Sequence, residues 1–109
     1  MAEATFADAH IHAELWHSLA SLLRSYTAAH GLHRNQLAVI EQDERRITVS
    51  HSGKWLELRR EHAFIAWTRE NGTSGALELT EHGRLRGAAG EEELDLAAEA
   101  WARELMHES

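Results

Sequence analysis

Histidines and a carboxylate near the N-terminus have spacings that could hold a metal ion. His10, Glu14 and His17 stand at positions i, i+4 and i+7, so an α-helix would bring them onto one face. Imidazole and carboxylate groups both bind divalent metals, and Glu-x-x-His occurs in di-metal helix bundles. Such bundles need facing ligands from four helices, whereas this trio lies opposite the apolar side of its helix. We therefore expect a solvated face, with His12 packed at its margin.

A second group of residues offers a nucleophile and a base. Ser50-His51-Ser52 places two hydroxyls beside an imidazole. Nucleophilic catalysis also needs an orienting group and a defined geometry, which adjacency in the chain does not provide. Four more histidines lie near glycines or turns and show no catalytic spacing: His30, His33, His62 and His82. Gly83, Gly87 and Gly90 lack the lysine of a phosphate-binding loop, so we interpret them as turn residues.

The stretch from Arg46 to Thr80 predicts consecutive antiparallel strands. Apolar and polar residues alternate through much of it, which is the period of a half-buried strand. Its turn sequences, such as Ser52-Gly53, leave no room for the crossovers that parallel strands need. With Leu37–Glu41 before it and an edge strand at 84–86, we expect a meander of four to six strands. Alternation assigns six residues to the core: Ile47, Val49, Leu56, Leu58, Leu77 and Leu79.

An amphipathic helix is expected on each side of these strands. The first spans Phe6–Ala29, with an apolar stripe of Ile11, Leu15, Leu19, Leu22 and Tyr26. Trp16 and Leu23 widen this stripe. The second opens with Glu91–Glu93, where acids suit the positive end of the helix dipole. Its stripe is Leu94, Ala98, Trp101 and Leu105. Two such helices and one half-buried sheet predict an α+β fold, a two-layer sandwich with both helices on one face.

Length and composition restrict the class of protein. A chain of 109 residues predicts a single domain over 1–109. The net charge of -7 disfavours nucleic acid as a partner, because phosphate binding needs excess cations. No apolar run reaches the ~20 residues of a membrane helix, and no secretory signal is visible, so we expect no membrane partner. The chain has no cysteine, which favours a cytoplasmic setting, and no motif for a cofactor.

The sheet face opposite Leu56 and Leu58 is the strongest candidate for a binding surface. Trp55, Glu57 and Arg59 belong to it by alternation. The following strand is apolar on both faces, so either Phe64 or Trp67 joins Trp55. Aromatic patches on exposed surfaces mark protein contacts, and tryptophan is enriched in binding hot spots. The candidate partner-binding residues are Trp55, Glu57, Arg59 and Trp67. Alternatively, neighbouring Arg and Glu stems cover the tryptophans.

Residues Arg59–Trp67 resemble the Arg-Gln-Glu-Pro stretch and strand tryptophan of the frataxin family, and Gly72–Leu79 resembles its next hairpin. The order of elements is also similar. The resemblance implies iron binding on an acidic ridge and contact with the iron–sulfur assembly machinery. Arg60 and His62 replace the Gln and Pro of the family. The ridge is reduced to five carboxylates: Asp8, Glu14, Glu41, Asp43 and Glu44.

Three functions follow from these patterns. The first is a non-enzymatic domain that associates through the sheet face with Trp55, either as a homodimer or as an adaptor for another protein. The second is a frataxin-like binder of iron or another divalent metal. The third is a small enzyme with a cleft between the helices and the end of the sheet, which would use His51 or His82.

Overall fold

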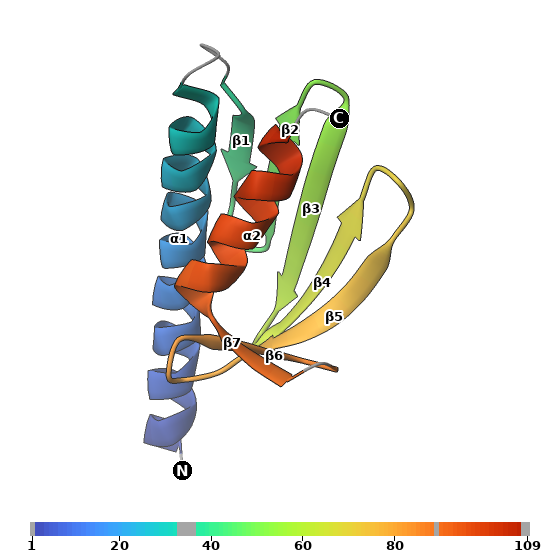
Figure 1. The fold of residues 1–109 in the computed structure, drawn as a ribbon. Helices are drawn as coiled ribbons and strands as arrows, with labels where there is room; N and C mark the ends of the chain where they lie inside the picture. Colours follow the sequence, from blue (N-terminus) through green and yellow to red (C-terminus); the bar gives the residue numbers. More distant parts are fainter. Residues whose placement is uncertain (1, 33–36, 89, 108–109) are drawn as a thin grey trace.

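One helix precedes a seven-stranded sheet and a second helix follows it (Figure 1). This computed structural model describes residues 2–32, 37–88 and 90–107, with side chains from His10 onward. The elements are α1 (Ala2–Gly31), β1 (Val39–Gln42), β2 (Arg46–His51), β3 (Lys54–Glu61), β4 (Phe64–Arg69), β5 (Ser74–Leu79), β6 (Arg84–Gly87), β7 (Gly90–Glu93) and α2 (Leu94–Met106). The strands lie in chain order and all neighbours are antiparallel, so the α+β class and the meander are confirmed.

The number of strands differs from the prediction of four to six. The additional strand β7 contains the three glutamates that were expected to open the second helix. They pair instead with β6, where Arg84 faces Glu93 and Arg86 faces Glu91. Opposite charges directly across an antiparallel pair stabilise it, and this favours a strand over a helical turn. The second helix therefore begins at Leu94.

Tight turns hold the central strands in register. Ser52 and Gly53 both have positive φ, at 50° and 84°, which is the conformation of a type I′ hairpin turn. This turn places Ser50 opposite Trp55. His62 in the next turn also has a positive φ, 56°, which is unusual for a residue with a side chain. These short connections explain why sequential strands are neighbours throughout the sheet.

Both helices pack on one face of the sheet, as predicted. The buried apolar residues from the strands are Ile47, Val49, Leu56, Leu58, Ile65, Leu79 and Leu85. The α2 stripe is buried as expected. In α1 the most buried residues are Trp16, Leu19 and Leu23, so the buried face is centred on the side where Trp16 and Leu23 were expected to widen the stripe. The reason is that α1 contacts α2 as well as the sheet, and Trp16 Nε1 donates to the Asp43 carbonyl at 2.8 Å.

The helical cover does not extend over the whole sheet. In Figure 1 the β4–β5 hairpin reaches beyond α2. Leu77, predicted for the core, is only half-buried there. On the opposite face, none of the helices in the described part of the chain covers the strands. Neither of these helices is long and apolar enough to cross a membrane.

Candidate functional site

The uncovered face of β3 carries Trp55, Glu57 and Arg59, as alternation predicts. Trp55 keeps 40% of its surface exposed. The Glu57 carboxylate lies 2.9 Å from the Arg59 guanidinium and 3.9 Å from that of Arg46 on β2. Arg46 and Arg59 thus both pair with the carboxylate of Glu57, which holds the three charged groups against the sheet. They form a polar stretch beside Trp55.

Trp67 lies on the face of the sheet opposite to Trp55. Of the two alternatives for the aromatic residue that joins Trp55 on its face, the one with Trp67 is therefore wrong. Register pairs Trp67 with Leu58, whose side chain points to the helices. The Arg69 guanidinium stacks on the Trp67 ring, 5.3 Å from its centre. Gly75 is opposite on β5, and a Cβ there would come within 2.7 Å of the indole. Trp67 is therefore packed into the layer that faces α2. Its role in partner binding is untested.

Phe64 is the outward-facing aromatic residue of β4, with 62% of its surface exposed. It does not form one patch with Trp55. Phe64 pairs with Glu61, which lies six residues along β3 from Trp55. At about 3.3 Å per residue this is a separation of roughly 20 Å. The two aromatic residues thus stand at opposite ends of the uncovered face.

Trp55 instead has apolar neighbours at the β1 edge. Leu37, Val39 and Trp55, which we name the Trp55 corner, are 80%, 60% and 40% exposed. They line one shallow hollow of about 250 Å³, together with Ser50 and the turn after it. β1 is an edge strand, and edge strands present unpaired backbone groups. Sequence reasoning missed this corner because it depends on the pairing of Val39 with Ser50, and of Ser50 with Trp55.

The Trp55 ring has no stacked cation among the described side chains. Arg60 lies over Trp16, at 5.7 Å from the ring centre, and Arg69 lies over Trp67. An arginine guanidinium therefore lies over each of these two rings, whereas no described arginine or lysine lies over Trp55.

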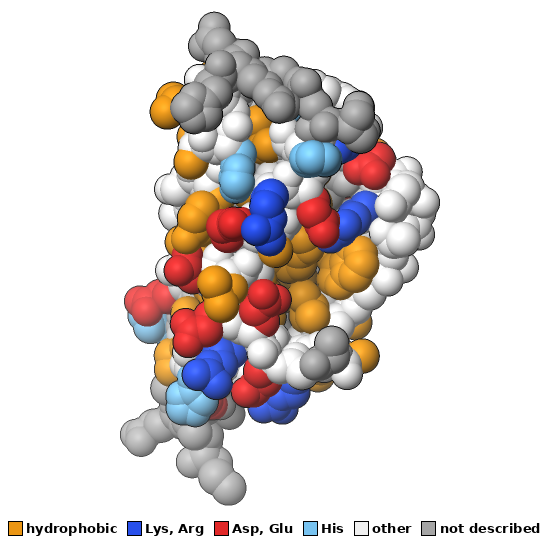
Figure 2. Space-filling model, viewed as in Figure 1, with side chains coloured by type: hydrophobic (Ala, Val, Ile, Leu, Met, Phe, Trp, Pro, Cys, Tyr) orange, Lys and Arg blue, Asp and Glu red, His pale blue; other side chains and the backbone are white. Residues whose placement is uncertain are grey.

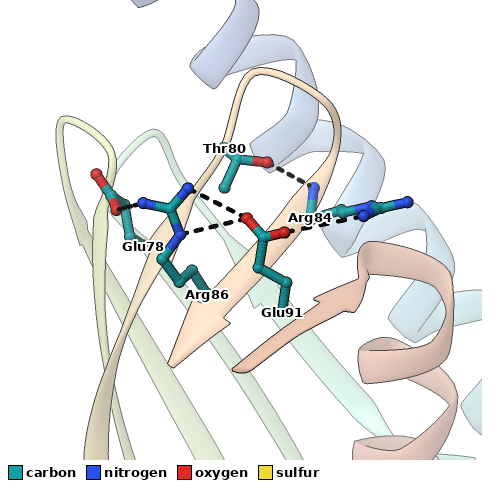
Figure 3. Close-up of polar contacts among 5 residues, drawn as sticks. All are labelled: Glu78, Thr80, Arg84, Arg86 and Glu91. Carbon is teal, nitrogen blue, oxygen red and sulfur yellow. Dashed lines mark hydrogen bonds and ion pairs between the residues drawn. The ribbon is translucent and has the colours of Figure 1, made fainter. Parts of the chain in front are cut away.

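Another part of the same face carries a ladder of alternating charges (Figure 3). Arg86 on β6 lies between Glu78 on β5, at 3.2 Å, and Glu91 on β7, at 3.1 Å. Glu91 also faces Arg84 at 3.8 Å, and Arg84 reaches Glu93 at 3.6 Å. Each charged side chain in the ladder therefore has a neighbour of opposite charge. We interpret it as the contact that joins β5, β6 and β7 rather than as a ligand site.

The residues on α1 that were considered as metal ligands, and for which a solvated face was expected, do not converge. His10 Nε2 lies 3.0 Å from the Glu14 carboxylate, whereas His17 Nδ1 contacts Gln42 Nε2 on β1 at 2.8 Å. Over residues 2–32, 37–88 and 90–107 no group of three potential ligands is close enough to hold a metal ion. His12 is half-buried, as predicted. The Asp8 side chain and His33 lie outside the described part of the chain.

The residues considered for catalysis are also apart. Ser50 points to the uncovered face, whereas His51 is buried on the other face with Nδ1 3.4 Å from the Leu105 carbonyl oxygen. His62 and His82 are exposed in separate turns. Among the described side chains no serine or threonine hydroxyl forms a hydrogen bond with a histidine ring, so no described pair has the arrangement of a nucleophile with its base.

Two groups have pKa values displaced by local hydrogen bonds. The backbone N–H groups of Arg45 and Arg46 donate to the Asp43 carboxylate, at 2.8 and 2.7 Å, and lower its pKa. The Tyr26 hydroxyl donates to Asp95, which raises the pKa of the tyrosine because the bond stabilises the neutral phenol. Asp43 is in the β1–β2 turn, and Tyr26 joins α1 to α2. Both contacts support the fold rather than a reaction.

Comparison of this chain with family models, with curated proteins and with solved structures found no match. The resemblance to frataxins thus stays a prediction carried by the order of elements and the residues quoted above.

Proposed function

We propose that this protein is a non-catalytic association domain that forms a homodimer through the Trp55 corner of its uncovered sheet face. The observation that carries the proposal is the grouping of Leu37, Val39 and Trp55, which are 80%, 60% and 40% exposed around one hollow. Exposed apolar side chains that gather on one part of a surface are a frequent mark of protein contacts. A cytoplasmic setting is part of the proposal, and the absence of cysteine supports it.

The net negative charge of the chain disfavours contact between two copies over most of their surface. It therefore favours the Trp55 corner as the place where a second copy binds. With a net charge of -7, two copies repel each other over most of their surface. No arginine or carboxylate is among the described residues that line the corner, and the Lys54 ammonium points to the end of α2. A two-fold axis would place each Trp55 against the Val39 edge of the other copy. Such symmetric dimers are the commonest oligomers of soluble proteins.

Light scattering coupled to size exclusion tests the proposal on wild type, Trp55→Glu and Phe64→Glu. We expect wild type at twice 12.3 kDa and Trp55→Glu at 12.3 kDa, because a carboxylate in the contact would be desolvated. Phe64→Glu is the matched control, since it puts the same charge on the same face far from the corner. It should remain a dimer. Circular dichroism of each variant shows whether the fold is intact.

Two results would contradict the proposal. One is a wild-type mass of 12.3 kDa at every concentration up to the millimolar range. The other is a dimer that persists in folded Trp55→Glu. If that dimer dissociates in Phe64→Glu instead, the contact lies at the other end of the face.

A further inference from the structure

A hollow of about 300 Å³ lies between the last turns of α2 and the adjoining ends of β3 and β4. Its apolar lining consists of three buried side chains: Leu56, Trp101 and Leu105. Its polar lining consists of Lys54, Arg69, Glu70, Arg103, Glu104 and His107. Figure 2 shows hydrophobic side chains between α2 and the strands beside it, with charged side chains of both signs close by. An apolar lining with a few polar groups is typical of a small-molecule pocket.

Most charges around this hollow already have partners inside the protein. Glu104 forms an ion pair with Arg69, and Arg103 lies 3.4 Å from Glu99. The Glu70 carboxylate accepts a backbone hydrogen bond from the start of β3 at 3.1 Å. These groups compensate one another, so they do not by themselves select a charged ligand.

Lys54 is the exception, and it is the single lysine of the chain. Its ammonium donates to the carbonyl oxygens of His107 and, at 3.3 Å, of Glu104. Among the described residues, no carboxylate forms an ion pair with it. An ammonium has three N–H donors, so one donor and the full positive charge are left for another partner. The two carbonyls hold the ammonium at the edge of the hollow.

We propose that this hollow binds a small carboxylate with an apolar body, with the carboxylate next to Lys54 and the body over Trp101. A volume of about 300 Å³ accommodates roughly ten non-hydrogen atoms, at about 30 Å³ each. The carboxylate supplies a counter-charge that no described residue gives Lys54, in a charge-assisted hydrogen bond. Binding removes the apolar body of the ligand, and the small exposed part of Trp101 and Leu105, from water.

Titration of carbon-13-labelled wild type with decanoate, kept below its micelle concentration, tests the proposal without any variant. Because Lys54 is the only lysine, its Cε–Hε cross-peak identifies the site directly. We expect a saturable shift of this peak with decanoate. Acetate lacks the apolar body and decylammonium has the opposite charge, so both should bind at least ~10-fold more weakly. An unmoved peak at ~1 mM decanoate, or an equal response to acetate, overturns the proposal.

Calorimetry on a pair of variants supplies a second test. Lys54→Met keeps an apolar stem and removes the charge, and should weaken decanoate binding about tenfold. Arg24→Gln removes one positive charge from α1 and should leave the affinity within about twofold. Equal affinity in Lys54→Met and wild type overturns the proposal. If Lys54→Met loses its fold, the titration of the wild-type cross-peak decides. The Trp55→Glu variant should still bind decanoate, so this proposal and the dimer fail independently.

Discussion

Along β3 the side chains of Leu56 and Leu58 are 1% and 0% exposed, whereas Trp55 on the other face keeps 40% of its surface in contact with solvent. The same strand thus supplies the core on one face and the Trp55 corner on the other. Two helices cover one side of a seven-stranded sheet, and no described helix covers the other. Large apolar residues in this sheet therefore have two separate roles. Leu58 contributes to folding, and we assign Trp55 to association.

The largest effect should come from truncating each face of β3 in turn. Leu58→Ala leaves a cavity in the core and should lower the free energy of unfolding by about 2–5 kcal/mol. Trp55→Ala should cost about 1 kcal/mol or less, because its side chain is already partly hydrated. Urea unfolding at a low protein concentration measures both without the contribution of a dimer. Equal losses would mean that Trp55 is as important to the core as Leu58.

A second prediction concerns Gly75, on the face of the sheet that the helices cover. A Cβ at this position meets the Trp67 indole at 2.7 Å, so Gly75→Ala should destabilise the protein by about 1–3 kcal/mol through overpacking. Ser74→Ala, at the neighbouring exposed position, should change stability by no more than ~0.5 kcal/mol. Thermal unfolding of the two variants compares them. A Gly75→Ala variant as stable as wild type would show that Trp67 moves freely, contrary to its packed position.

The Asp43 turn should make the β1–β2 end of the sheet sensitive to acid. The folded pKa of Asp43 is lowered by two backbone hydrogen bonds. Its contribution to stability is therefore fully present above the ordinary value of about 3.9 and is lost as the pH falls through the lowered pKa. Wild type should exceed Asp43→Asn in stability at pH 6, and the difference should shrink toward pH 2. Glu44→Gln, which alters the next carboxylate, should show a smaller change with pH.

The smallest effect should be at the contact between the two helices. Tyr26 is the only tyrosine, so absorbance at 295 nm follows its ionisation alone. Its raised pKa predicts a midpoint above about 10, and Asp95→Asn should lower that midpoint. Because the folded pKa is raised, the stability from this bond is present below the ordinary pKa and is lost as the pH rises through the raised one. An unchanged midpoint in Asp95→Asn would exclude the bond as its cause.

Much of this fold could be predicted from local patterns. Alternation assigned Ile47, Val49, Leu56 and Leu58 to the core, and all four are buried. β7 was missed because three consecutive glutamates suit a helix start equally well. What favoured the strand is the pair of arginines on β6, which the sequence places several residues away.

The candidate sites could be predicted only in part, since each joins residues that are distant in the chain. The exposed face of Trp55 followed from the period of its own strand. The placement of Val39 and Trp55 on either side of Ser50, around one hollow, requires two strand pairings at once. The position of Lys54 at the end of α2 joins residues 50 or more positions apart.

The sequence alone determined the helices, the central strands, their antiparallel order and the acidic balance, because periodicity, turn residues and charge act locally. The tertiary structure alone decided that Trp67 faces the helices and Phe64 faces outward, because β4 is apolar on both sides. It also decided where the apolar corner and the hollow at Lys54 lie. Both depend on strand register and on the position of α2, which are set by contacts between residues far apart in the chain.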